Sequence, residues 1–329
     1  MPDGNDLARN LLGEIEASLV DAPAPDVLPP PRPGPLARVQ HLVFAALLVA
    51  LALVLAGPAL AGKKKQIAPP PLVAAPPTAA ALTLLDAAIA DGRLDDARQM
   101  LAPMWSSGMP EVALRGAELA LAAGSLPEAA TGFSGLVDGP LAAAARQGLG
   151  ITLLRQGRAA EARRELEQAV SLDPGLARAW NALAVMADRA KDWTASDAAY
   201  GKAIAAAPAD ATLLANRGWS MLLRGHPVAA ERDLAAALQM APGLTSARTN
   251  LALARAMQGR YEDAFRLSDK KTLATDLNTV GYAAMMRGDL AIAEAYFNRA
   301  LSLNPQFDRA AWDNLQYLTA LKSAARQPQ

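Results

Sequence analysis

Small and large apolar residues recur at fixed offsets along most of the chain, and the clearest copy of this pattern lies in residues 274–307. The positions that carry it are Leu277, Gly281, Gly288, Ala293, Phe297, Ala300 and Pro305. Small residues let two helices cross with their backbones close together, and the large residues fill the remaining volume. A glycine can end the first helix in a left-handed conformation, and a proline cannot continue the second. The pattern therefore predicts a pair of helices joined by a short turn.

The same spacing sets the register of the neighbouring copies. Pro174, Pro208 and Pro242 lie 34 residues apart. The turn positions keep that interval if Lys191 counts as one of them: Gly157, Lys191, Gly225 and Gly259. Seven units are predicted, at 78–109, 110–142, 143–176, 177–210, 211–244, 245–273 and 274–307. The sixth is short because SDKKTLATD replaces the end of its second helix, and residues 308–329 are expected to form a capping helix with Trp312, Leu315, Leu318 and Leu321 on one face.

This arrangement resembles the tetratricopeptide repeat (TPR), a helix-turn-helix unit of 34 residues. The resemblance implies an all-α TPR solenoid over residues 78–307, with about seven helix pairs followed by the capping helix. It also implies a function in binding another protein. In this family an inner concave groove, lined by the first helix of each pair, holds the partner.

The segment before the solenoid has a different composition. Residues 1–37 form a tail in which Leu7, Leu11, Ile15 and Leu19 follow helical spacing. This stretch is either part of a disordered tail or a docking helix for a partner. Residues 21–37 are rich in proline and are expected to act as an extended spacer.

Residues 38–61 contain a membrane-inserted hydrophobic segment, because 42–56 is apolar without a charge and the run continues to about residue 61. Two interpretations remain open. The segment is either a single transmembrane anchor or a signal cleaved after Ala59-Leu60-Ala61. Residues 62–77 form a Lys/Pro-rich linker. Arginines before the segment and Lys63–Lys65 after it give conflicting signals for orientation. We expect an inner-membrane protein with its repeats in the periplasm.

Composition argues against several kinds of function. Lysine plus arginine equals aspartate plus glutamate at 32 each, so no nucleic-acid partner is expected. There is no cysteine, and the two histidines, His41 and His226, are expected to be structural or solvated. Gly148-Leu149-Gly150 follows no strand and is interpreted as helix packing rather than a dinucleotide site. Glu161, Glu165 and Glu167 are interpreted as helix-surface partners of nearby arginines. No catalytic, metal or cofactor site and no small-molecule substrate is predicted.

The TPR resemblance places candidate contacts at positions 2, 5, 9 and 12 of the first helices. The candidate peptide-binding groove comprises Gln147, Arg178, Asn181, Val185, Trp219, Leu222, Asn278, Tyr282 and Met285. Ile151, Leu154, Asp188 and Thr212 occupy equivalent positions. The mixture of apolar and polar side chains suits an extended or helical protein segment. The alternative is that Val185, Leu222 and Met285 belong to the core between neighbouring repeats, whereas Trp219 and Tyr282 are expected to contact the partner.

Residues 246–297 are also similar to the TPR lipoprotein of the Flp/Tad pilus assembly system. Leu60-Ala61-Gly62 has the form of a lipoprotein box, but Lys63 stands in place of the lipidated cysteine. The sequence thus predicts a non-enzymatic, membrane-tethered scaffold or adaptor of the bacterial envelope, and the resemblance points to pilus or secretion-system assembly. The rival hypotheses are a cytoplasmic-facing adaptor of a membrane complex and an envelope enzyme whose repeats recruit substrate.

Overall fold

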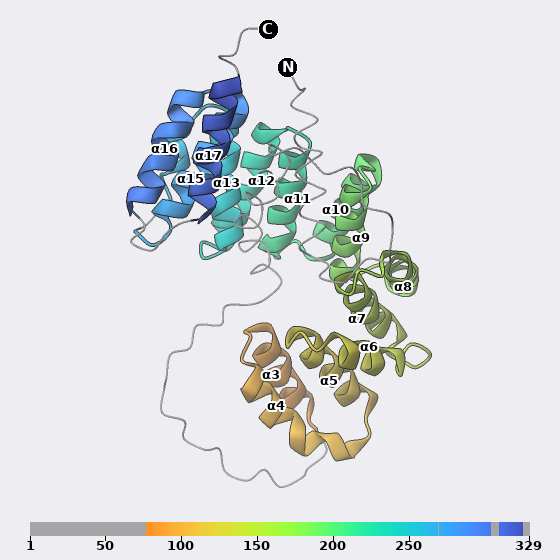
Figure 1. Cartoon of the computed structure of the whole chain (residues 1–329). Helices are drawn as coiled ribbons and strands as arrows, with labels where there is room; N and C mark the ends of the chain where they lie inside the picture. Colours follow the sequence, from red (N-terminus) through yellow and green to blue (C-terminus); the bar gives the residue numbers. More distant parts are fainter. Residues whose placement is uncertain (1–76, 269, 304–308, 325–329) are drawn as a thin grey trace, which may run out of the picture. The chain divides into compact units, whose positions relative to one another are not determined.

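The computed structural model of the chain describes residues 77–268, 270–303 and 309–324. These residues form fifteen α-helices and one 3₁₀ helix, with no strand among them (Figure 1). The predicted all-α fold is confirmed for this part of the chain. None of its helices is both long and apolar enough to cross a bilayer. The amphipathic stretch 5–20, the proline-rich spacer, the hydrophobic segment 42–61 and the linker up to residue 76 lie outside the described residues.

The chain divides into two compact units, and residues 77–207 are the described part of the first. Its helices pack as consecutive pairs, because each buries its apolar side against the next. They are α3 (Ala79–Ala90), α4 (Leu94–Leu101), η1 (Ala102–Ser107), α5 (Pro110–Ala122), α6 (Leu126–Ser134), α7 (Ala142–Arg155), α8 (Ala159–Leu172), α9 (Ala177–Arg189) and α10 (Trp193–Ala206).

The described part of the second unit begins at Pro208, and its helices pack in the same way. Its helices are α11 (Ala211–Leu223), α12 (Pro227–Met240), α13 (Thr245–Met257), α14 (Tyr261–Ala264), α15 (Leu273–Arg287), α16 (Leu290–Leu303) and α17 (Arg309–Ala324). α14 is only one turn long, where SDKKTLATD departs from the repeat. α13 therefore packs directly against α15.

Glycines on the first helices permit the close crossing that the pattern predicts. A Cβ added at Gly150 would lie 2.6 Å from Cγ of Leu166, and one at Gly218 would lie 2.7 Å from Cγ of Leu234. At Gly148 the ring of Phe133 would be 2.3 Å away. These separations leave no room for a side chain. The packing interpretation of Gly148-Leu149-Gly150 is confirmed.

The turns between paired helices use the left-handed conformation that favours glycine. Gly157, Gly225 and Gly259 have φ between 73° and 78°. Lys191 takes the same conformation with φ 58°, and it is the one non-glycine residue with positive φ in the described chain. The assignment of Lys191 to the turn position is confirmed, although an L-residue there carries a steric cost.

α17 covers the end of the second unit, but not with the face that was predicted. Leu318 and Asn314 are fully buried, whereas Trp312 remains 43% exposed. Successive steps of three residues each turn a helix by about 300°, so Trp312 and Leu321 lie about 180° apart. The predicted set could not occupy a single face, and Asn314 takes the buried place instead.

Candidate protein-binding surface

The first helices of successive pairs lie side by side in the first unit, α5 against α7 and α7 against α9. Residues 178, 181 and 185 share one side of α9, and residues 147, 151 and 154 share one side of α7, because they follow helical spacing. Contacts between these sides, described below, show that they form one surface. We call it the first inner face; its residues are Glu118, Gln147, Ile151, Leu154, Arg178, Asn181 and Val185.

An ion pair crosses this face. The guanidinium of Arg178 on α9 donates to both carboxylate oxygens of Glu118 on α5, at 3.1 and 3.3 Å. The two helices each flank α7, so the pair passes over it. The Arg178 side chain is 52% exposed and that of Glu118 22% exposed. Arg178 therefore remains accessible to a partner, although it is already bonded within the chain.

Gln147 on α7 makes a structural contact with α9. Its side-chain oxygen accepts the backbone N–H of Ala179 at 3.0 Å, and the residue is 8% exposed. The N–H groups in the first turn of a helix have no partner within the helix. The N–H of Ala179 also donates to the carbonyl oxygen of Leu176, the N-cap residue, at 3.0 Å, so Gln147 is its second acceptor. The hydrogen bond from Ala179 ties α7 to the start of α9, and Gln147 offers little surface to a bound segment.

Apolar side chains fill the rest of the first inner face. Ile151, Leu154 and Val185 are each half-buried, and so is Asn181. Asp188, one turn further along α9, is buried and accepts hydrogen bonds from Ser196 Oγ at 2.5 Å and from Tyr200 Oη at 3.0 Å. It fastens α10 to α9. The accessible part of this face is therefore a short apolar strip with Asn181 and Arg178 beside it.

Trp219 is the candidate residue of α11 that keeps an accessible side chain. It is half-buried and packs against the core of the second unit, whereas Leu222 is only 4% exposed within that core. Leu222 thus follows the alternative of a core residue between repeats. The indole of Trp219 retains surface that a partner can contact.

The three candidates on α15 are buried. Asn278 accepts a hydrogen bond from Asn314 Nδ2 on α17 at 2.8 Å. Tyr282 and Met285, at 8% and 5% exposure, belong to an apolar cluster with Leu318. The capping helix packs on this side of α15, which is the physical reason that these residues do not present an open face.

Arg155, near the first inner face, was not among the predicted residues. It donates to the carbonyl oxygen of Leu121 at 2.9 Å, and burial lowers the pKa of its guanidinium. A cation at the end of α5 is favourable because the last carbonyls of a helix carry partial negative charge. Glu118 was also not among the predicted residues, although it is the ninth residue of the unit 110–142 and so occupies one of the groove positions.

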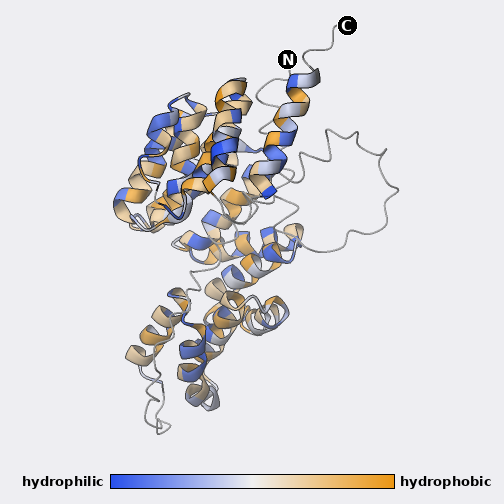
Figure 2. Cartoon of the chain, turned by 60° about the vertical axis from the view of Figure 1, so that its left-hand side comes forward, coloured by the Kyte–Doolittle hydropathy of each residue, from blue (hydrophilic) through white to orange (hydrophobic). Residues whose placement is uncertain are grey.

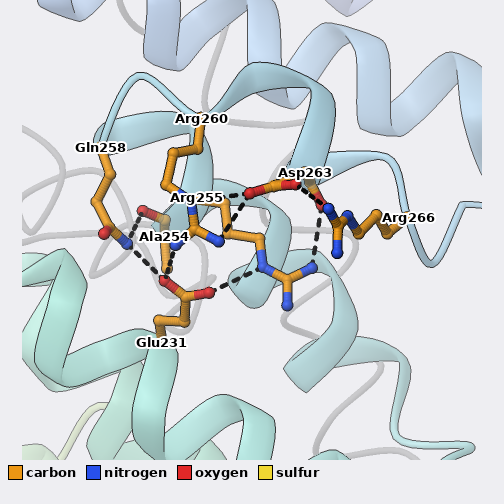
Figure 3. A network of polar contacts seen from close by, with 7 residues as sticks. All are labelled: Glu231, Ala254, Arg255, Gln258, Arg260, Asp263 and Arg266. Carbon is orange, nitrogen blue, oxygen red and sulfur yellow. Dashed lines mark hydrogen bonds and ion pairs between the residues drawn. The ribbon is translucent and has the colours of Figure 1, made fainter.

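A charged network in the second unit joins α12, α13 and α14 (Figure 3). Glu231 accepts from Arg255 at 3.0 Å, Gln258 at 2.8 Å and Arg260 at 2.7 Å. Asp263 bonds Arg260 and Arg266. Burial raises the pKa of Glu231, but hydrogen bonds from Gln258 and Arg255 and the charge of Arg260 more than offset it, so the pKa is lowered.

This network holds α12, α13 and α14 together and does not have the features of a reactive site. The hydrogen bond from Arg260 lowers the pKa of Asp263. Both carboxylates are therefore held ionised by arginines, which does not suit a general acid or base at neutral pH. No cluster of three or more potential metal ligands occurs in the part of the chain that the structure describes.

The pairing of Glu165 differs from the prediction. Glu161 pairs with Arg158, the N-cap residue of α8, and Glu167 pairs with Arg163 within α8, as expected. Glu165 instead accepts from Arg146 of α7 at 2.6 Å and links two helices. Figure 2 shows polar and apolar residues interspersed along the helices of both units. Neither kind of residue is confined to one unit.

Two stretches of the chain match models of the tetratricopeptide repeat family, residues 143–186 and residues 277–307. Tetratricopeptide repeats are thus present in both units, as the spacing predicts. No curated protein matches the chain in sequence.

Several solved structures are similar in fold. A chain of the APC/C hetero-tetramer Cut9-Hcn1 is 15% identical with a TM-score of 0.49, over 72% of this chain and 55% of its own length. A tetratricopeptide repeat protein from Parabacteroides merdae is 13% identical with a TM-score of 0.46, over 73% and 98%. The type IV pilus biogenesis factor PilW is 20% identical with a TM-score of 0.43, over 56% and 92%.

Proposed function

We propose that the chain is a non-enzymatic scaffold that binds a segment of another protein on the inner sides of its first helices. The observation that carries this proposal is the accessible strip on α7 and α9, where half-buried Ile151, Leu154 and Val185 lie beside the exposed guanidinium of Arg178. Apolar contacts supply affinity and a nearby polar group fixes the orientation of the bound segment. Trp219 on α11 is the proposed contact in the second unit.

The proposal narrows the predicted groove. Asn181, Val185, Arg178 and Trp219 remain as contacts of the partner. The buried candidates Gln147, Leu222, Asn278, Tyr282 and Met285 hold the repeats together and position those contacts. A partner can contact these buried residues only if α17 or another neighbouring helix moves aside.

We further propose that residues 42–61 tether the scaffold to the inner membrane, with the repeats on the periplasmic side. The uncharged run of sufficient length supports an anchor. The three lysines Lys63–Lys65 favour a second candidate, an adaptor whose repeats face the cytoplasm. A fusion reporter at Gln329 that is active only in the cytoplasm would establish that second orientation.

The pathway proposed for the scaffold is pilus or secretion-system assembly. Its support is the similarity of residues 246–297 to the TPR lipoprotein of the Flp/Tad system. Because Lys63 replaces the lipidated cysteine, attachment would depend on residues 42–61 alone. Sequencing the N-terminus of the mature protein distinguishes the anchor, with residues 42–61 retained, from a signal cleaved after Ala61.

The test of binding is crosslinked co-purification of the full chain from membranes. Wild type is compared with Val185→Asp and with Arg163→Asp, an exposed position on α8 outside the inner face. We expect Val185→Asp to lose the captured protein and Arg163→Asp to retain it. Equal capture by both variants would remove the inner face as the binding surface.

A further inference from the structure

The first helix of the solenoid carries an uncovered apolar side. Leu84 of α3 is 62% exposed. Ala80, Thr83 and Ala87 surround it along the helix and are exposed too. Asp86, the charged residue within α3, points away from this side and accepts a hydrogen bond from Arg115 of α5 at 2.7 Å. The uncovered side is therefore uncharged and mainly apolar, since the Thr83 hydroxyl donates to the carbonyl oxygen of Ala79 within the helix; we call this side the α3 face.

The repeat register explains why a residue of this type is exposed. Leu84 is the seventh residue of its repeat, and the residues at the same position in later repeats include Leu149, Leu183 and Leu251, with exposures of 8%, 8% and 2%. Their helices pack against the second helix of the preceding pair, as α7 does against α6 and α9 against α8. α3 has no such helix before it among the described residues.

The last helix of the second unit, α17, differs from α3 because its exposed side is mainly polar. The exposed side of α17 carries Gln316, Thr319 and Ser323 beside Trp312. Terminal helices of a repeat array normally present a polar outer side, because no neighbour covers them. α3 instead has the composition of an internal helix, which indicates that another segment covers it.

We propose that residues 66–76 of the same chain fold back along α3 and cover the α3 face. This stretch, QIAPPPLVAAP, is uncharged and contains Ile67, Leu72 and Val73. It enters α3 directly, since Thr78 is the N-cap whose side chain accepts the N–H of Ala81. A proline-rich strand advances about 3.1 Å per residue, so about six residues match the length of α3, about 18 Å.

The geometry favours this segment over a second copy of the chain. One side of α3 offers a footprint of only about 180 Å², whereas a stable dimer buries about 800 Å² on each partner. A segment joined to α3 by the chain itself acts at a local concentration of order millimolar and needs far less area. Both surfaces are uncharged, so no charge is buried unpaired.

The test uses disulfide trapping in the full chain, which has no cysteine of its own. Leu72→Cys is combined with Ala87→Cys on the α3 face or, as matched control, with Gln99→Cys, an exposed site on α4. Loop length alone would favour the first pair about 2.4-fold. We expect the first pair to form an intramolecular disulfide more than about tenfold faster. Two outcomes would overturn the proposal. One is a ratio of the two rates no greater than the roughly 2.4-fold that loop length explains. The other is that Ala87→Cys forms disulfides only with Ala87→Cys of a second chain.

A second measurement needs no covalent link. Hydrogen exchange of the α3 amides is compared between Leu72→Ser/Val73→Ser and the control Ala74→Ser/Ala75→Ser. We expect about three- to tenfold faster exchange along α3 in the first variant only, with α9 unchanged in both. Unaltered α3 exchange in the first variant would show that the linker does not cover this helix.

Discussion

Arg178 and Glu118 meet across α7, although they belong to helices two repeats apart. Both carboxylate oxygens of Glu118 accept from the Arg178 guanidinium, at 3.1 and 3.3 Å. This pair links α5 and α9 beside the proposed binding strip. A segment bound there must either lie beside the ion pair or replace Glu118 as the partner of Arg178.

We expect the pair to matter more for binding than for stability. Arg178→Ala should lower the free energy of unfolding by only about 0.2–1 kcal/mol, because more than half of the arginine is exposed and water screens the interaction. Urea titration of Arg178→Ala, Glu118→Ala and the double variant measures the coupling. A coupling well above 1 kcal/mol would contradict the assignment to a solvent-accessible pair.

Lys191→Gly should stabilise the protein by about 0.5–1 kcal/mol. Glycine removes the steric cost of the left-handed turn, which exceeds the added freedom of the unfolded chain. The matched control is Gly225→Lys, at φ 73° with open space around the added Cβ; by the same two contributions it should destabilise by about 0.5–1 kcal/mol. Thermal unfolding followed by circular dichroism measures both, and a loss of stability in Lys191→Gly would refute the account of this turn.

Much of the fold could be predicted because the repeat constrains it locally. The 34-residue spacing placed Lys191 at a turn even though its residue type argues otherwise, and φ 58° agrees. Gly148 and Gly281 were also predicted to lie at helix crossings, because two helices that approach so closely leave no room for a side chain.

The binding surface was harder to predict because it depends on what lies above each helix. Asn278 and Tyr282 occupy groove positions of their repeat, yet α17 covers that side of α15. Helical position specifies the direction of a side chain but not its neighbours from other helices. Glu118 occupies position 9 of the second unit, so the register places it on the inner side, but its pairing with Arg178, 60 residues away, depends on how α5, α7 and α9 pack.

The helix crossings predict opposite effects for two glycines within helices. Gly148→Ala should destabilise by about 1–3 kcal/mol, since its Cβ would lie 2.3 Å from the Phe133 ring. Gly201→Ala on α10 meets nothing within 4 Å and should stabilise by about 0.5–1 kcal/mol, because alanine favours the helix. Urea titrations compare them. A third glycine tests the repeat register. A Cβ added at Gly281 would lie 2.8 Å from the Phe297 ring, so Gly281→Leu should prevent folding. An unaltered melting temperature would contradict the register.

Acid should weaken the second unit through the network around Glu231. The pKa values of Glu231 and Asp263 are lowered in the folded protein from their ordinary values of 4.5 and 3.8. The unfolded chain then binds more protons at acidic pH, so their contribution is complete above the ordinary pKa values and is lost as pH falls through the lowered ones.

Urea titrations between about pH 6 and pH 3 measure this effect. Glu231→Gln should show a shallower loss of stability towards low pH than wild type. Glu128→Gln, at an exposed glutamate on α6, serves as the control and should follow the wild-type curve. A Glu231→Gln curve parallel to wild type would show that the network does not carry the acid sensitivity.

Trp219→Ala should weaken partner capture by about 1–3 kcal/mol while leaving helicity intact, because large aromatic side chains supply much of the affinity at protein interfaces. The half-buried indole also packs against the core of the second unit, so the substitution removes some core contacts in addition to the contact with the partner. Trp312→Ala on α17, a tryptophan 43% exposed and outside the inner helices, is the matched control and should bind normally. Affinity is measured by titration of the co-purified partner, and circular dichroism checks the fold. Unchanged affinity of Trp219→Ala, or an equal loss in Trp312→Ala, would show that the indole of Trp219 does not contact the partner.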